Sequence, residues 1–222
     1  MSTATVEEKV VVKKSEPLFS KKNRALVSNP LDIDNPVTVQ VLGICSALAV
    51  TTQMKPAFVM TIGLTVVAAS SSVAISFLRN TIPSRIRIIV QLAVVSLWVI
   101  MVDQLLKAYV YDVSKQLTVF VGLIITNCIV MGRLEAFAMG NKPWPSFMDG
   151  LGNGLGYGLI LMSIAFGREF LGSGSIFGYK VFAELGIPYQ GNGLLLFPAG
   201  ACILLGIIIW IQRTLNGFRE AH

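Results

Sequence analysis

The sequence predicts an all-α integral membrane protein with six transmembrane helices in two inverted three-helix repeats. Of its 222 residues, 54% are hydrophobic and only 14% are charged, whereas soluble domains carry roughly 25% charged residues. Six long stretches contain no charged residue, and similar short strings occur in the two halves of the chain. The composition therefore indicates the membrane class, the stretches indicate the number of spans, and the strings indicate the repeat.

The six uncharged stretches have lengths close to those of membrane spans. A bilayer-spanning helix needs about 20 mostly apolar residues, with roughly 17–25 tolerated. The stretches cover residues 37–54, 57–78, 88–102, 116–132, 150–167 and 185–212, and several are at the short end of this range. We therefore expect a membrane domain over residues 36–213 in which some spans are broken or tilted.

Charged residues outside the spans predict the orientation of this domain. Residues 1–35 mix acidic and basic side chains and contain no apolar core segment, so they do not form a signal peptide. We expect a flexible cytoplasmic tail there and a C-terminal tail at 214–222. With both termini inside, thirteen of the eighteen Lys and Arg residues face the cytoplasm, as the positive-inside rule requires. These residues account for the net charge of +6 without a nucleic-acid partner.

The two predicted repeats cover roughly residues 36–115 and 116–213. Thr-Val-x-Val occurs at 38–41 and 118–121, and Ala-Phe-x-Met occurs at 57–60 and 136–139. Three spans per repeat force the second copy into the membrane with the opposite orientation, and inverted repeats place functional sites near the midplane at discontinuous helices. Chance similarity between apolar segments is the alternative.

Cys45 and Cys128 lie at comparable places in the two repeats, which suggests a shared metal or redox centre. Three cysteines in apolar segments argue against a disulfide framework. The single histidine, His222, excludes a histidine-ligated haem or zinc within the chain. An iron–sulfur cluster normally takes four thiolates, of which a homologous partner could supply two. Packing of cysteine as a small apolar residue is the alternative, and we adopt it for Cys202.

Residues that weaken a helix stand next to both of these cysteines. Gly43 precedes Cys45 by two residues, and Thr126 and Asn127 directly precede Cys128. Glycine destabilises a helix interior, and Thr and Asn form local hydrogen bonds to the backbone. We therefore expect the cysteine-bearing helices to be discontinuous.

The fifth stretch contains alternating glycines with small-xxx-small spacing, which favours close packing of helices in lipid. The glycines are Gly150, Gly152, Gly154, Gly156 and Gly158. A phosphate-binding loop is excluded, because the dinucleotide fingerprint, a preceding strand and a Walker lysine are all missing.

Asp103 closes the third stretch, and Asp149 precedes the glycines. Charges at membrane depth are costly and suggest ion pathways or ion pairs. The residues alone favour a plainer interpretation, in which both mark the ends of spans at the headgroup layer. The same interpretation applies to Lys107, Arg133 and Glu135.

Four parts of the sequence carry a resemblance to a known family. They are LGICSALAVT at 42–51, RIIVQ at 87–91 with VDQ at 102–104, GLIITNCIVMGR at 122–133, and DGLGNGLGYG at 149–158. Over roughly residues 30–215 the chain resembles the family of the D-type subunit of the sodium-translocating NADH:quinone oxidoreductase. The E-type subunit of the Rnf complex belongs to the same family.

The resemblance implies a six-helix subunit paired with a homologous subunit of opposite topology, the E-type subunit. Both would belong to a six-subunit complex in the bacterial inner membrane. Each would give two cysteines to one 2Fe-2S cluster in the middle of the membrane. The ligands here would be Cys45 and Cys128, with Cys202 outside the motif. Asp103 and Asp149 match acidic positions that the family links to sodium handling.

The implied activity is electron transfer from NADH to ubiquinone coupled to sodium export. This chain would be a non-autonomous subunit of that translocase, an electron relay without a catalytic residue of its own. NAD, FAD, FMN, riboflavin and ubiquinone would bind to other subunits. Three alternatives stay open: the E-type subunit of the Rnf ferredoxin:NAD oxidoreductase, a stand-alone secondary transporter, and a structural scaffold.

Overall fold

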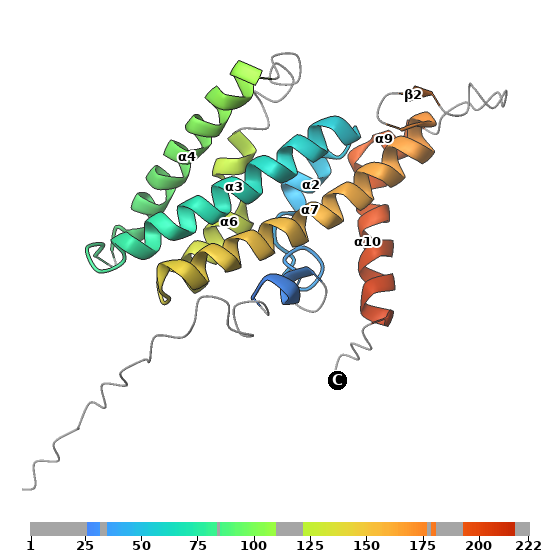
Figure 1. Cartoon of the computed structure of the whole chain (residues 1–222). Coiled ribbons are helices and arrows are strands. Elements are labelled where there is room, and N and C mark those ends of the chain that lie inside the picture. The colour runs from blue at the N-terminus through green and yellow to red at the C-terminus, as the bar shows by residue number, and fades with distance from the viewer. Residues whose placement is uncertain are drawn as a thin grey trace, which may run out of the picture.

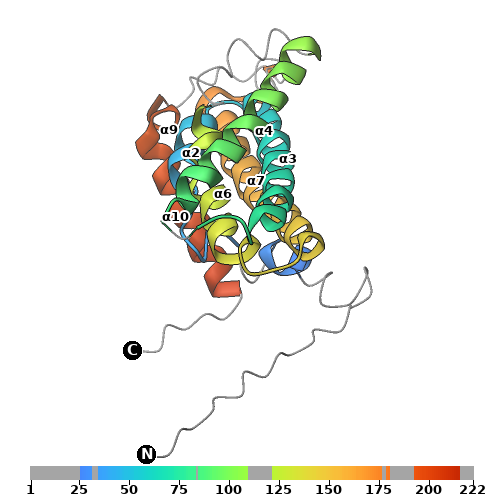
Figure 2. The ribbon, with the colours of Figure 1, turned by 90° about the vertical axis from the view of Figure 1, so that its left-hand side faces the viewer.

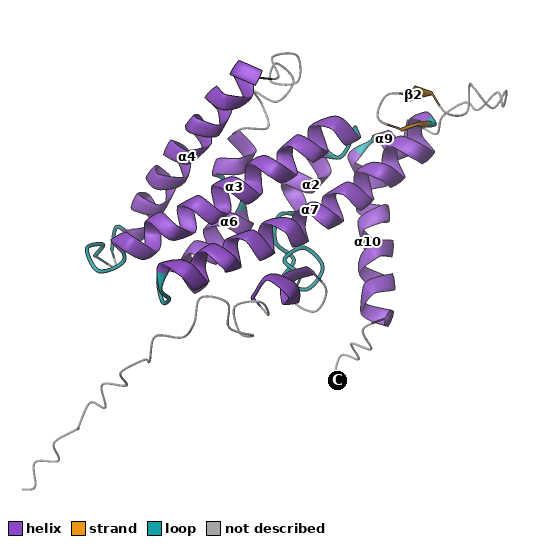
Figure 3. Ribbon diagram, viewed as in Figure 1, coloured by secondary structure: helices purple, strands orange, loops and turns teal. Residues whose placement is uncertain are grey.

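The computed structural model describes residues 26–31, 35–83, 85–109, 122–176, 179–180 and 193–215, which are largely helical (Figures 1 and 3). The elements are η1 (Asn29–Leu31), α2 (Ile44–Val50), α3 (Met54–Leu78), α4 (Arg87–Tyr109), α6 (Cys128–Arg133), η2 (Leu134–Ala138), α7 (Pro143–Ser173), α9 (Gly193–Leu196) and α10 (Pro198–Leu215). Two short strands, β1 (Ser175–Ile176) and β2 (Tyr179–Lys180), pair antiparallel. Apart from these two short strands, the described elements are helical, as the predicted all-α class requires.

Helices α3 and α7 form the centre of the molecule, and Figure 1 shows them side by side. They are antiparallel, because Gly150 of α7 approaches Ala68 of α3 while Gly154 approaches Thr65. Helix α4 packs on α3, and α10 contacts α7 on the other side of the bundle.

Three helices in the described part of the chain are long and apolar enough to cross a membrane: α3, α4 and α7. Helix α10 contains a shorter apolar stretch at 198–214. These helices confirm a membrane protein with several apolar helices. The count of six spans and the repeats remain predictions.

The alternating glycines of α7 serve two different faces of that helix. Because a helix has 3.6 residues per turn, residues two apart point in nearly opposite directions. Gly150 and Gly154 face the backbone of α3, whereas Gly152 faces the backbone of Leu26 and Val27. The predicted close packing is therefore present on both sides of α7.

The region assigned to the N-terminal tail, 1–35, is described only at 26–31 and 35. Residues 26–31 are helical, and η1 packs against α7. Asn35 is fully buried, and its amide Nδ2 donates to the Gly156 carbonyl at 3.1 Å. This part of the predicted tail therefore packs on the membrane domain, and the other residues of the tail, like 216–222, lie outside the described residues.

Helices α2 and α6 are short, and they lie behind the α3–α7 pair in Figure 1 and beside it in Figure 2. They run toward opposite ends of the bundle. Helix α2 leads through Thr51 to the start of α3, where the Met54 N–H donates to Glu169 near the end of α7. Helix α6 leads through η2 to Asn141, whose carbonyl accepts from Ser76 near the end of α3. The N-terminal ends of α2 and α6 therefore meet between the two ends of the bundle.

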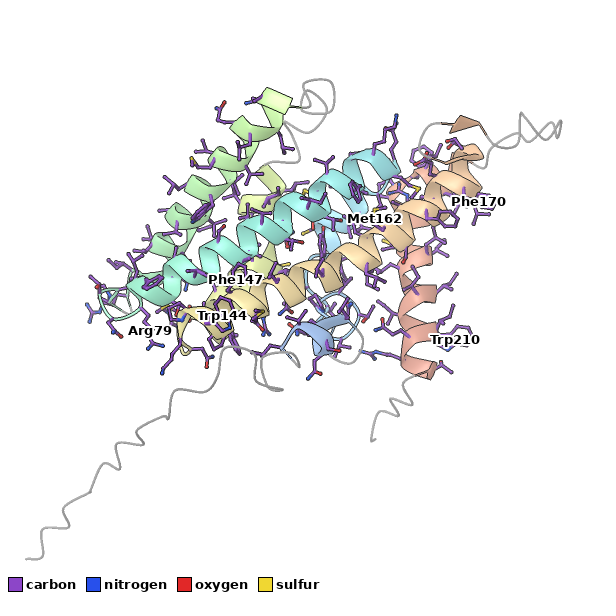
Figure 4. All side chains as sticks on the ribbon, viewed as in Figure 1. Arg79, Trp144, Phe147, Met162, Phe170 and Trp210 are labelled. Carbon is purple, nitrogen blue, oxygen red and sulfur yellow. The ribbon has the colours of Figure 1, made fainter. Side chains whose placement is uncertain are left out.

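Large apolar side chains remain exposed on the outside of the bundle. Trp210 on α10 is 71% exposed and projects outward (Figure 4), and Ile88, Ile89, Leu97 and Leu105 are exposed on α4. In water such a surface would be unfavourable. It fits lipid or another membrane subunit.

Candidate metal centre

The chain reaches Cys45 through a tight turn held on α7 by Asn35. The Asn35 Oδ1 accepts from the Val37 N–H at 3.0 Å, and the Leu42 N–H donates to the Pro36 carbonyl at 2.9 Å. Val41 and Gly43 then adopt positive φ angles of 58° and 77°. Positive φ is unusual for a β-branched residue, so the surrounding contacts must hold this turn. Helix α2 begins directly after it, with Cys45 as its second residue.

The chain reaches Cys128 through a break in the helix. Residues 122–125 are helical, Thr126 and Asn127 interrupt the helix, and α6 begins at Cys128. Asn127 is the N-cap of α6, because its Oδ1 accepts from the Ile129 N–H at 3.1 Å. Both cysteines therefore lie at the start of a short helix: α6, with 6 residues, is separated from helical residues 122–125 by Thr126 and Asn127, and α2, with 7 residues, follows a turn.

The structure brings the two cysteine-bearing turns together. The Gly43 N–H donates to the Cys128 Sγ at 2.8 Å, a contact between residues 85 positions apart. A side chain at Gly43 would collide with Ile129, the residue after Cys128. The Cys45 side chain is exposed and that of Cys128 is partly exposed. The Cys128 thiol thus lies against the turn that leads into Cys45, at the surface of this chain.

Metal-ligating side chains are few at this place. Within the described ranges, His, Cys, Asp and Glu form no group of three or more that could hold a metal ion. Cys202 lies on α10 and is exposed, and no described contact links it to the other two cysteines. The chain therefore offers two thiols for a metal centre, and a four-thiolate site needs ligands from elsewhere.

A buried polar network lies directly behind the two thiols. Ser46, Asn127 and Tyr157 are each at most 1% exposed. The Ser46 hydroxyl lies 2.8 Å from the Tyr157 hydroxyl, and the Asn127 amide donates to Ser46 at 3.1 Å. Neither Ser46 nor Tyr157 belongs to the candidates predicted from sequence, although the position of Ser46 directly after Cys45 is a signal that could have found it.

Arg168 joins the far end of α2 to α9 and is fully buried. Its guanidinium donates to the Leu48 carbonyl and the Thr51 hydroxyl at the end of α2, at 3.2 and 2.8 Å. It also donates to the carbonyls of Leu195 and Leu196 in α9, at 3.0 and 2.6 Å. A cation at carbonyl-rich helix ends is favourable. The only sequence signal for this role is an arginine directly after an uncharged stretch.

The two acidic candidates each have a basic partner. Asp149 is 2% exposed and pairs with Arg133, whose Nε donates to the Asp149 Oδ2 at 2.9 Å. Asp103 pairs with Lys107 one helical turn away, at 2.6 Å. The plainer interpretation of Arg133 as a residue that marks a span end is incomplete, because Arg133 neutralises a buried carboxylate.

Glu135 lies in η2, a π-helical segment. It pairs with Arg87 at 2.5 Å and accepts from the Gln91 amide at 3.0 Å. These contacts connect α4 to η2, which directly follows α6, the short helix that begins at Cys128. Glu135 therefore does more than mark the end of a span, because it forms a specific contact between η2 and α4.

Comparisons with known proteins agree with the sequence resemblance. A family model described as "Rnf-Nqr subunit, membrane protein" matches residues 24–209. A protein of Shewanella woodyi, named as the D-type subunit of Na(+)-translocating NADH-quinone reductase, is 58% identical over 199 residues, covering 89% of this chain and 95% of the relative. A protein of the same name from Haemophilus ducreyi is 58% identical over 193 residues, covering 86% and 93%. The four motif strings lie within the matched range.

Proposed function

The chain belongs to the Rnf-Nqr family of membrane-protein subunits, and from this we propose that it is a membrane electron-relay subunit of a sodium-pumping NADH:quinone reductase. In this proposal it shares a 2Fe-2S cluster with a homologous subunit of opposite topology, the E-type subunit. Electron transfer would be coupled to sodium export. The convergence of the Cys45 and Cys128 turns is the observation that carries the proposal.

The donor set fits half of such a cluster. Cys45 and Cys128 offer two thiols at one exposed place, and a cluster of this type normally takes four thiolates. The described residues around them provide no third ligand of the usual kinds. A second chain that presents an equivalent pair would complete the set. When bound, the cluster would exchange single electrons.

The residues of this chain would prepare the site for negatively charged sulfur. The Gly43 N–H already points at the Cys128 Sγ, and a backbone donor stabilises a thiolate. Hydrogen bonds to the sulfurs also set the potential of an iron–sulfur centre. The exposed Cys45 side chain would face the partner subunit.

The opposite directions of α2 and α6 support the proposed inverted repeats. Each half of the chain contains a short helix at its cysteine followed by a long helix, α3 or α7. We propose that both termini are cytoplasmic and that the complex of six subunits lies in the bacterial inner membrane.

Asp103 and Asp149 remain our candidates for sodium handling in this chain. Each carboxylate is already paired, with Lys107 and Arg133 respectively. A sodium ion at either residue would therefore compete with a bound cationic side chain. Asp103 and Asp149 therefore differ from an open cation site, in which the carboxylates would have no cationic side chain as a partner.

Replacing each ligand with serine in the purified complex tests the proposed cluster. Cys45→Ser and Cys128→Ser should each abolish its electron paramagnetic resonance signal and lower quinone reductase activity by at least tenfold. Cys202→Ser is the matched control and should keep both. A full signal and full activity in either ligand variant would contradict the proposal.

A further inference from the structure

We propose that Tyr157 is a positioning residue for the two candidate ligands, acting through its hydrogen bond with the Ser46 hydroxyl. The expected change in the potential of the cluster rests on the proposed function. The expected positioning of the two thiols does not, because it can be measured without a cluster. Tyr157 belongs to α7, the helix that also supports the turn before Cys45. Neither thiol is bonded to it directly in the described contacts.

Counting the hydrogen bonds of Ser46 identifies Tyr157 as a donor. A serine hydroxyl has one hydrogen to donate and two lone pairs that accept. The Ser46 hydroxyl donates to the Gly43 carbonyl at 2.9 Å and accepts from the Asn127 amide at 3.1 Å. Its second lone pair is left for the Tyr157 hydroxyl at 2.8 Å. The bonding capacity of this hydroxyl is then fully used.

Ser46 and two of its partners, Gly43 and Asn127, lie within two residues of a cysteine in the sequence. Ser46 follows Cys45, and Asn127 precedes Cys128 while capping α6. The Gly43 carbonyl accepts a hydrogen bond from the Ser46 hydroxyl, and the Gly43 N–H donates one to the Cys128 Sγ. One hydroxyl therefore fixes both cysteine-bearing turns relative to each other.

The tyrosine ring adds a packing contact to this arrangement. A side chain at Gly43 would come within 3.2 Å of the Tyr157 ring, so the ring lies directly against the turn. Tyr157 is fully buried. Loss of the Tyr157 hydroxyl would leave one lone pair of the buried Ser46 hydroxyl without a hydrogen bond, which is unfavourable. Tyr157→Phe would keep the ring and remove only the donor.

We expect Tyr157→Phe to loosen the Gly43 N–H contact with the Cys128 Sγ. Weaker hydrogen bonding to a cluster sulfur disfavours the reduced state, which carries more negative charge. The midpoint potential of the cluster should therefore shift to more negative values. A tenfold change in the one-electron equilibrium corresponds to about 59 mV, and we expect a shift of up to that size.

The experiment uses the whole purified complex and two independent measurements. Redox titration followed by electron paramagnetic resonance reports the potential and the line shape. After removal of iron, dibromobimane, which becomes fluorescent when it bridges two thiols, reports how readily Cys45 and Cys128 are joined in a Cys202→Ser background. Ser46→Ala is a second test of the same network. Ser71→Ala is the control, because Ser71 is equally buried and bonds only to carbonyls of its own helix α3.

Support requires that Tyr157→Phe and Ser46→Ala both shift the potential and slow bridging by at least threefold, while Ser71→Ala changes neither. Unchanged potential and bridging in Tyr157→Phe would overturn the inference and leave the proposed function standing. If the cysteine variants kept the cluster, the proposed function would fail, and the bridging rates would still decide whether Tyr157 positions the thiols.

Discussion

The Asp149 carboxylate lies between the Arg133 guanidinium and the Asn153 amide, and its side chain is 3% exposed. The Asp103 carboxylate, which pairs with Lys107, is 15% exposed, and the Lys107 side chain is 43% exposed. Exposed pairs contribute little because water screens them, whereas loss of one partner from a buried pair leaves an uncompensated charge. The two candidate acids should therefore respond differently to substitution.

We predict that Asp149→Asn lowers the stability of the complex by about 3 kcal/mol, because Arg133 then keeps a partly buried charge without its counter-charge. Asp103→Asn should cost about 0–1 kcal/mol. Thermal unfolding of the purified complex in detergent provides the comparison. The double variant Arg133→Gln with Asp149→Asn should recover part of the loss. Equal loss in Asp103→Asn and Asp149→Asn would contradict this account.

At the scale of elements, the contact between α3 and α7 depends on glycine. A Cβ at Gly154 would lie 2.8 Å from the Thr65 Cα, so the two backbones are already in close contact. Small residues allow this approach in a membrane, where dispersion contacts rather than water drive the packing of helices.

We predict that Gly154→Ala separates α3 from α7 and destabilises the complex by about 1–3 kcal/mol. Gly206→Ala on α10 is the matched control, because a Cβ there would meet nothing within 4 Å. Alanine is up to about 1 kcal/mol better than glycine in a helix, so Gly206→Ala should be neutral or stabilising. Thermal unfolding measures both variants, and opposite signs are the expected outcome.

Sequence reasoning predicted the elements wherever the signal was local. Gly43 directly precedes α2, and Thr126 and Asn127 separate α6 from helical residues 122–125, as expected from residues that weaken a helix. The glycines of α7 predicted close packing, but not that alternate glycines face different segments. The partners Ser46 and Tyr157 lie 111 residues apart, and Arg168 and Leu48 lie 120 apart. Such contacts depend on how the helices assemble, which apolar composition alone does not specify.

At the scale of the whole molecule, part of the apolar surface of this chain is not covered by the chain itself. Only 17% of the apolar window in α4 is buried within the chain, against 56% and 61% for the windows in α3 and α7. The Cys45 side chain is exposed as well. Lipid can cover an apolar helix face, but it cannot supply sulfur ligands. If Cys45 ligates the proposed cluster, this part of the surface must therefore contact a protein partner.

We predict that the chain purified alone contains almost no iron or acid-labile sulfide. Co-expression with the homologous partner should restore about two irons per pair of subunits, because two thiols from each chain complete the set of four. Iron and sulfide analysis of the two preparations measures this difference. Co-expression with a partner that lacks its own cysteine pair controls for effects of assembly alone and should leave iron low. Two irons per single chain would show that this polypeptide supplies every ligand, and one iron per chain in a homodimer would show that a second copy can replace the partner.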